Sequence, residues 1–189
     1  MVYLENTLAF DDSRQPVPAK LERALDLVQH HSLGEHPVAI ENNRLVLRFF
    51  KCRLSSQFTP ADTAGDVTHV TTCASLPTGH AIPFSALQTL AMTEGGLLRL
   101  ERLCHLAHVV NHFIASGNTG PLSLPLNARL ANQGISSHDQ RFLSVLEKLG
   151  IEPARLRVTL PAKLEPVIEA MLTEHYQRVG IPFTPNEPR

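Results

Sequence analysis

The pattern of apolar and polar positions predicts a different kind of structure in each part of the chain. Residues 20–31 repeat apolar side chains at helical spacing and stop before Gly34 and Pro37, which predicts a short helix. Residues 44–54 are rich in β-forming side chains, and residues 66–76 alternate β-branched with other side chains, so each segment predicts a strand. Residues 55–65, which include Pro60, predict a polar loop between the two strands.

The longest helical pattern lies between residues 97 and 115. Pro83 predicts the start of a shorter helix before it, and Gly95-Gly96 predicts the break between the two. One side of the longer helix is an apolar stripe spaced by three and four residues: Leu100, Leu103, Ala107, Val110 and Ile114.

Strands and helices alternate in the rest of the chain. Short strands are predicted at residues 122–126 and 156–160, and a last helix at residues 162–179. A helix between the two strands is predicted to be capped by Ser136 or Ser137 and closed by Gly150. Residues 181–189 contain three prolines and predict irregular structure. The alternation indicates βα units and an α/β fold whose sheet is at least partly parallel.

Composition narrows the class of protein. The 189 residues suit one domain, and 43% hydrophobic with 19% charged residues is ordinary for a globular protein. A net charge of −1 lacks the clustered basic excess that nucleic acids or anionic membranes require. The apolar runs are too short to cross a bilayer, and the N-terminus carries acids where a signal peptide carries basic residues. We therefore expect a cytoplasmic protein with no nucleic-acid or membrane partner.

Two motifs resemble those of the EAL family of cyclic-di-GMP phosphodiesterases. Pro125–Leu130 (PLNARL) resembles the family's NLSARQL pattern, and Gly150–Pro161 (GIEPARLRVTLP) resembles its GLxPxxLxLEITE pattern. Residues 39–54 and 78–98 resemble two earlier segments of the family, in the family's order. The resemblance implies that residues 38–189 form a truncated EAL-like α/β domain, about half of a TIM-type (βα) barrel, and that residues 1–37 are an N-terminal leader with a short helix.

The same resemblance implies that the family's chemistry is lost. The family's metal-binding asparagine falls on Pro125 and its metal-binding glutamate on Thr159, and neither side chain can replace these ligands of a hard divalent cation. The glutamate of the EAL tripeptide is expected in residues 68–76, which contain no Asp or Glu. The family's later aspartate pair, lysine and final glutamate belong to a half of the barrel that this sequence does not contain. We therefore predict no catalytic residue, no cofactor and no phosphodiesterase activity.

Degenerate members of the family often serve as regulators, so the resemblance implies a bacterial protein in cyclic-di-GMP signalling that controls motility, adhesion or biofilm formation. Half a barrel has two sheet edges and an exposed apolar sheet face, which invite association. We expect a partner protein or a second copy at such an edge, hence a homo-oligomer or a protein complex. A non-hydrolysing cyclic-di-GMP receptor is the first alternative. In the family an arginine two residues after the EAL glutamate contacts the dinucleotide; this arginine and the carboxylates are missing here, which counts against the alternative.

Histidines supply a further alternative. His105, His108 and His112 lie on one side of the long predicted helix, opposite the apolar stripe, and Cys104 is adjacent. A spacing of four residues can place two side chains on one metal ion, so these histidines are weak metal candidates in an unrelated small α/β enzyme or metal-binding protein. A solvated helix face is the simplest interpretation, and a pH-sensitive contact surface is another.

Overall fold

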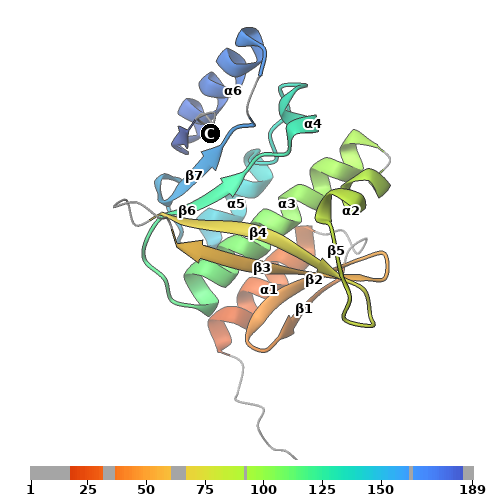
Figure 1. Ribbon diagram of the computed structural model, residues 1–189. Helices are drawn as coiled ribbons and strands as arrows, with labels where there is room; N and C mark the ends of the chain where they lie inside the picture. Colours follow the sequence, from red (N-terminus) through yellow and green to blue (C-terminus); the bar gives the residue numbers. More distant parts are fainter. Residues whose placement is uncertain (1–17, 32–36, 61–66, 92, 162–163, 185–189) are drawn as a thin grey trace, which may run out of the picture.

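The computed structural model describes residues 18–31, 37–60, 67–91, 93–161 and 164–184, and shows a mixed α/β fold. Among these residues the strands form one eight-stranded sheet in the order β1-β2-β3-β4-β6-β7-β8, with β5 paired to β4 (Figure 1). The end strands β1 and β8 are not paired with each other in the described part of the chain, so the sheet there is open. The predicted α/β class is confirmed.

The first half of the sheet is antiparallel. Its strands are β1 (Val38–Glu41), β2 (Arg44–Phe49), β3 (Cys52–Pro60), β4 (Thr68–Ser75) and the short β5 (Ala81–Ile82). The single strand predicted over residues 44–54 is wrong, because the chain reverses at Phe50-Lys51 and continues as β3. Phe50 takes a φ of 52°, a conformation that a bulky residue rarely adopts, so no local sequence pattern predicted this turn. The loop predicted over residues 55–65 is also wrong as far as Pro60, where β3 ends.

The second half of the sheet is parallel. It contains β6 (Leu122–Pro125), β7 (Leu156–Thr159) and β8 (Phe183–Thr184), and β6 also runs parallel to β4. Strands β6 and β7 lie within residues 122–126 and 156–160, where the sequence predicted them. The irregular tail predicted over residues 181–189 is wrong at Phe183 and Thr184, which pair with Val158 and Thr159 of β7.

Helices lie at the five predicted positions, with ends that differ by up to several residues, and α4 (Ala128–Ala131) was not predicted. The other helices are α1 (Ala19–His31), α2 (Phe84–Leu90), α3 (Glu94–Val110, continued as a π-helical turn over Asn111–Ala115), α5 (Gln140–Leu149) and α6 (Pro166–Val179), with a 3₁₀ turn at Pro153–Arg155. The glycine pair at 95 and 96 lies inside the first turn of α3, whose N-cap is Thr93. The cap of α5 is Asp139, not Ser136 or Ser137, and Gly150 closes the helix as predicted.

Helix α3 lies at the centre of the fold, against β2 and β3 of the sheet on one side and against α1 and α5 on the other. Its predicted apolar stripe is buried except for the partly buried Ile114, and the opposite side is buried as well, since every residue from Leu100 to His112 is buried. Helix α1 packs beside it with Leu21, Ala24 and Val28 fully buried in the same core (Figure 1). The predicted solvated face of α3 is therefore wrong. Residues 1–17 of the predicted leader lie outside the described residues.

The helices cover one face of the sheet, and the other face is polar. Leu54, Val70, Leu122 and Val158 face the helices and are buried. Alternate positions on the opposite face include Gln57, His69, Thr71 and Arg157, all at least partly exposed. The exposed apolar sheet face that the sequence led us to expect is not present on the described strands. No helix in the described part of the chain has the length and apolar character needed to span a membrane.

Candidate functional site

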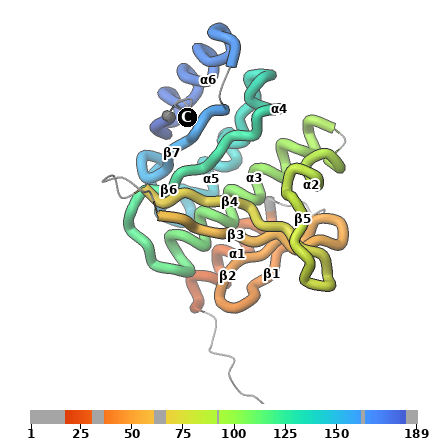
Figure 2. The backbone as a smooth tube through the Cα atoms, viewed as in Figure 1, coloured from red at the N-terminus to blue at the C-terminus, as the bar shows by residue number. Residues whose placement is uncertain are grey.

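A pocket lies where the antiparallel and parallel halves of the sheet separate. Strands β4 and β6 pair only at Thr68–Leu122 and His69–Ser123, and then diverge so that a wedge opens between them (Figure 2). Side chains of α3 form the inner wall of this wedge, and α2 lies along its outer side. We call this space the wedge pocket. Its volume is about 560 Å³, which is in the range of small-molecule sites.

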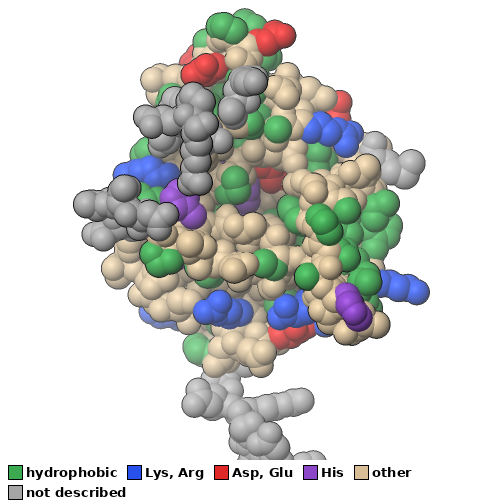
Figure 3. All heavy atoms as spheres, viewed as in Figure 1, with side chains coloured by type: hydrophobic (Ala, Val, Ile, Leu, Met, Phe, Trp, Pro, Cys, Tyr) green, Lys and Arg blue, Asp and Glu red, His purple; other side chains and the backbone are tan. Residues whose placement is uncertain are grey.

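The wedge pocket combines apolar walls with a few polar groups. In Figure 3 acidic and histidine side chains are visible in the hollow near the centre of the face shown. The pocket is lined by His69, Val70, Thr71 and Thr72 of β4, Phe84 and Gln88 of α2, Glu101, Cys104, His105 and His108 of α3, Ser123 and Pro125 of β6, Thr159 of β7, and Leu126, Asn127 and Ala128 after β6.

Glu101 is the acidic group of the pocket. Its side chain is 4% exposed, and its Oε1 accepts a hydrogen bond of 2.8 Å from the backbone N–H of Asn127. Its Oε2 is buried and has no hydrogen-bond partner among the described residues. Burial raises the pKa of Glu101 to about 8, and the bond from Asn127 opposes this only in part. The carboxyl is therefore mostly protonated near neutral pH.

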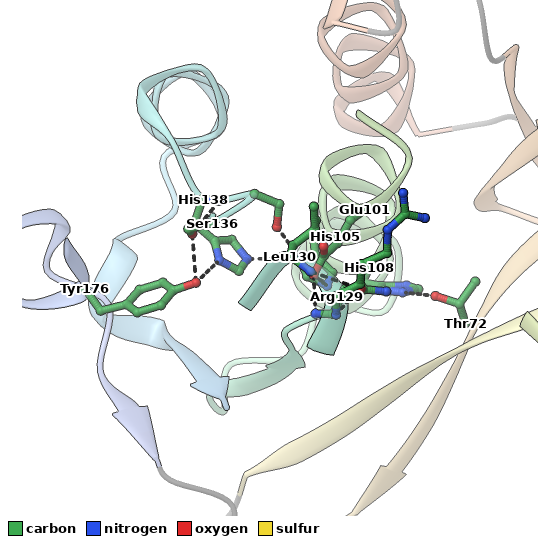
Figure 4. A network of polar contacts seen from close by, with 11 residues as sticks. Thr72, Glu101, His105, His108, Arg129, Leu130, Ser136, His138 and Tyr176 are labelled. Atoms are coloured by element: carbon green, nitrogen blue, oxygen red, sulfur yellow. Dashed lines mark hydrogen bonds and ion pairs between the residues drawn. The ribbon is translucent and has the colours of Figure 1, made fainter. Parts of the chain in front are cut away.

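A row of polar groups, buried except for the half-buried Ser136, runs from the pocket to the last helix (Figure 4). Nδ1 of His105 lies 3.0 Å from Nε2 of His138, and Nδ1 of His138 lies 3.0 Å from the hydroxyl of Tyr176 on α6. That hydroxyl is also 2.8 Å from Oγ of Ser136. Burial lowers the pKa of His105 to about 4 and that of His138 well below its ordinary value, so both rings are neutral. We call Ser136, Tyr176, His138 and His105 the buried row.

His108 and His112 are held separately from this row. The two ring nitrogens of His108 contact the hydroxyls of Ser56 at 2.7 Å and Thr72 at 2.9 Å. Nε2 of His112 contacts the carbonyl of Gly120 at 3.0 Å. The three histidines predicted to share one helix side do so, but each is buried and hydrogen bonded to the protein. No group of three His, Cys, Asp or Glu side chains among the described residues could hold one metal ion.

The positions that the motif comparison marked as degenerate lie together. Pro125 ends β6, Thr159 ends β7, and the two residues are opposite each other in the parallel ladder. The hydroxyl of Thr159 is 2.9 Å from that of Ser123, so these strand ends present hydroxyl and apolar groups to the pocket. Residues 68–76, the other marked segment, supply the β4 wall through His69, Thr71 and Thr72.

Charge is sparse around the wedge pocket. None of its described lining residues is Lys or Arg. Arg102, which follows Glu101, is bonded to Asp139 at 2.6 Å, and Arg129 lines a neighbouring hollow between α2 and α4. An anionic ligand would therefore find hydroxyls and amides in the pocket but no positive charge.

The arrangement offers little for nucleophilic catalysis. Oγ of Ser137 is 3.2 Å from Nδ1 of His105, and Nε2 of His105 is 4.0 Å from Oε1 of Glu101. This order of groups resembles that of a Ser-His-Glu catalytic triad. However, Ser137 is fully buried and does not line the pocket, so no substrate reaches its hydroxyl. Burial also raises the pKa of the Cys104 thiol to about 12, which keeps it protonated and weakly nucleophilic.

Sequence reasoning missed Glu101, His138 and Tyr176. Glu101 is the only acid between Leu97 and Val110, and it lies one turn before His105 on the same helix, which could have drawn attention to it. His138 and Tyr176 come together only through the packing of α6 against the loop before α5, for which the sequence carries no local pattern. Comparison with models of known protein families and with curated proteins gave no match.

Proposed function

We propose that this chain is a non-catalytic regulatory protein, built on a degenerate EAL-like scaffold of about half a TIM-type barrel, that acts by binding another protein or a second copy of itself. The observation that carries the proposal is the position of Pro125 and Thr159. They end adjacent parallel strands and line one pocket, where such folds place their catalytic groups. Two-metal hydrolysis of a phosphodiester needs carboxylates at such positions, and the side chains present there cannot supply them.

The charge of the wedge pocket counts against the receptor alternative. Cyclic-di-GMP carries two phosphate charges, which need cationic or N–H partners. The described lining residues include no Lys or Arg, and Glu101 is an acid. A protein partner is therefore favoured over the dinucleotide as the molecule that this chain recognises.

Helix α6 presents the most exposed apolar pair on any described helix. Val167 is 61% and Met171 53% exposed, and their spacing of four residues places them on one side of the helix. Such a pair, beside a sheet that is open in its described part, suits contact with another protein. A role in motility, adhesion or biofilm control is part of the proposal through the family resemblance.

Enzymatic activity is tested directly. The purified protein is incubated with cyclic-di-GMP and Mg²⁺ or Mn²⁺, and we expect no linear product. Isothermal titration with the dinucleotide is expected to show no binding. A linear product would refute the absence of phosphodiesterase activity, and saturable binding would favour the receptor alternative.

The contact surface is tested by substitution. We expect the double variant Val167→Lys/Met171→Lys to lose a partner that the wild-type chain captures from its own cells, while its circular dichroism and Tm stay unchanged. The matched control is Leu90→Lys, an equally exposed side chain on α2, which should retain the partner. Light scattering tells a second copy from another protein. Equal capture by both variants would contradict this surface.

A further inference from the structure

Glu101 is an acid without a counter-charge. One of its oxygens is bonded to the backbone of Asn127, and the other has no partner among the described residues. Burying a carboxyl oxygen without a hydrogen-bond partner costs free energy, and buried polar atoms in proteins nearly always have such a partner. The position in a pocket wall makes a ligand the natural source of the missing partner.

The groups around Glu101 decide which ligand fits. The same pocket is lined by Phe84, by Ser123 and Thr159 with their hydroxyls, and by Gln88 with its amide. Carboxyl, hydroxyl and amide oxygens all accept hydrogen bonds, and an aromatic face attracts positive charge. The titratable or charged groups that face Glu101 or border its pocket are His69, Cys104, His105, His108 and, in the neighbouring hollow, Arg129.

We propose that the wedge pocket binds a compact organic cation, an amidinium, guanidinium or primary ammonium group on a small apolar body, with its N–H donors on Glu101. The cation supplies the counter-charge that the chain itself does not, and the apolar walls formed by Phe84, Leu126 and Pro125 enclose the body of the ligand. This site is separate from the α6 surface of the proposed function, so either proposal can fail alone.

Binding requires Glu101 to lose its proton. The carboxyl is mostly protonated in the empty pocket, so the cation binds the ionised form and one proton leaves to solvent. Affinity therefore falls as the pH falls below the pKa of the carboxyl, by about tenfold between about pH 9 and about pH 7. An uncharged ligand would not show this dependence, and an anion would show the opposite one.

Three isosteric probes test the charge of the ligand. Benzamidine, benzamide and benzoate share one ring and one planar substituent, and carry a positive, zero and negative charge. We expect titration calorimetry to show benzamidine binding at millimolar concentration, about tenfold or more tighter than benzamide, with no binding of benzoate. Titrations in buffers with different ionisation enthalpies should show that proton release accompanies binding.

A substitution at Glu101 tests whether benzamidine binds at this residue. Glu101→Gln keeps an oxygen that can accept from the Asn127 N–H and removes the charge. Its affinity for benzamidine should therefore be lower by about tenfold or more, while any weak binding of benzamide should remain. Glu94→Gln, an exposed acid in the first turn of the same helix, should bind benzamidine as the wild type does. The proposal is overturned if benzamidine does not bind, if benzamide or benzoate binds as tightly, or if Glu101→Gln binds benzamidine unchanged.

Discussion

Tyr176 carries its hydroxyl into the core and uses it twice, toward Ser136 and toward His138. Tyr176 and His138 are both fully buried, so water cannot replace the contact between them, whereas Ser136 is half-buried. His138 in turn contacts His105, and through this buried row a side chain of α6 is linked to the wall of the wedge pocket. The hydrogen bonds thus hold three segments that are far apart in the sequence.

Tyr176→Phe removes only the hydroxyl and leaves Nδ1 of His138 without its partner in the core, while the half-buried Ser136 keeps the N–H of His138. We expect a loss of about 1–3 kcal/mol in the free energy of unfolding, measured by urea denaturation. Thr89→Ala is the control, because the Thr89 hydroxyl is exposed and bonds only its own helix; its effect should stay within about 0.5 kcal/mol. Equal effects of the two variants would contradict the role given to the buried row.

The pH dependence of stability is expected to have two limbs with different origins. Glu101 holds its proton more tightly when folded, so its contribution is full below about pH 4.5 and is lost as the pH rises to about 8. His105 and His108, with pKa values lowered by burial to about 4 and about 3, act in the opposite sense: their contribution is full above about 6.5 and is lost as the pH falls. Stability should therefore be greatest near about pH 7.

Glu101→Gln separates the two limbs. The variant lacks the titrating carboxyl, so its stability relative to the wild type should improve by about 1 kcal/mol between about pH 7 and about pH 8. Above about pH 4.5 the acid limb should rise more steeply than in the wild type, because the opposing contribution of the carboxyl is gone; below about pH 4.5, where the histidines alone titrate, it should be unchanged. Denaturation curves at a series of pH values measure both, and an unchanged alkaline limb would show that Glu101 is already ionised in the folded protein.

At the scale of elements, α3 shows how far an apolar repeat can be trusted. The repeat predicted the helix and its buried stripe, and both are present. It could not show that the side carrying His105 and His108 is buried as well, because a histidine on a solvated face and one bonded to Ser56 and Thr72 look alike in a sequence. The partners come from β3 and β4, more than thirty residues away.

Asn111 holds α3 to the sheet where the helix changes to a π-helical turn. Its amide accepts from the N–H of Leu45 at 2.6 Å and donates to the carbonyl of the same residue at 2.8 Å, beyond the point where β2 and β3 stop pairing. The side chain thus takes the place of a strand partner. Asn111→Ala leaves both backbone groups unpaired, and we expect a loss of at least about 2 kcal/mol in the free energy of unfolding.

The measurement for Asn111 is thermal and urea unfolding of the variant beside that of Asn118→Ala. Asn118 follows the same helix but its side chain is bonded only to the ring of His112, at 3.3 Å. We expect the control to lose much less stability than Asn111→Ala. A small loss for Asn111→Ala, comparable to the control, would mean that water or a shifted strand satisfies Leu45.

Asp139 joins α3 to α5 through two separable roles. It caps α5 by accepting from the N–H groups of Arg141 and Phe142, and it pairs with the buried Arg102. Asp139→Asn retains the cap and loses the charge, whereas Asp139→Ala loses both. We expect the alanine variant to be less stable than the asparagine variant by about 1 kcal/mol, as urea denaturation would show. Equal stability would mean that the cap contributes nothing.

At the scale of the whole molecule, α6 is the least anchored of the long helices. It buries Leu172 and Tyr176, whereas α3 is buried along most of its length. Stability is not uniform in such a structure, and weakly packed helices open more often. We expect amide hydrogens of α6 to exchange with solvent at least about tenfold faster than those of α3, measured by mass spectrometry. Equal protection would contradict this ranking.

The sequence predicted the α/β class and most elements, but not how the two halves of the sheet meet. The alternation after Leu122 predicted β6, α5 and β7, because the spacing of the hydrophobic residues and the positions of the turn residues indicate the same elements there. The hairpin at Phe50-Lys51 lacks Gly, Asn, Asp or Pro, so no local pattern marked it. The wedge pocket depends on the divergence of β4 from β6, a property of strand twist and distant packing. The half-barrel interpretation stays a prediction.

Among the described residues, the two halves of the sheet are joined by the two residue pairs that start β4 and β6 and by the bond from the N–H of Thr68 to the carbonyl of Pro121. A small rotation about this short junction would widen or narrow the space beside α3 without breaking a pair elsewhere in the sheet. The side chains that span the gap, rather than the strands, then set how far the two halves stand apart. A molecule bound in this space would fix the separation of the two halves, and with it the position of every element attached to the parallel half.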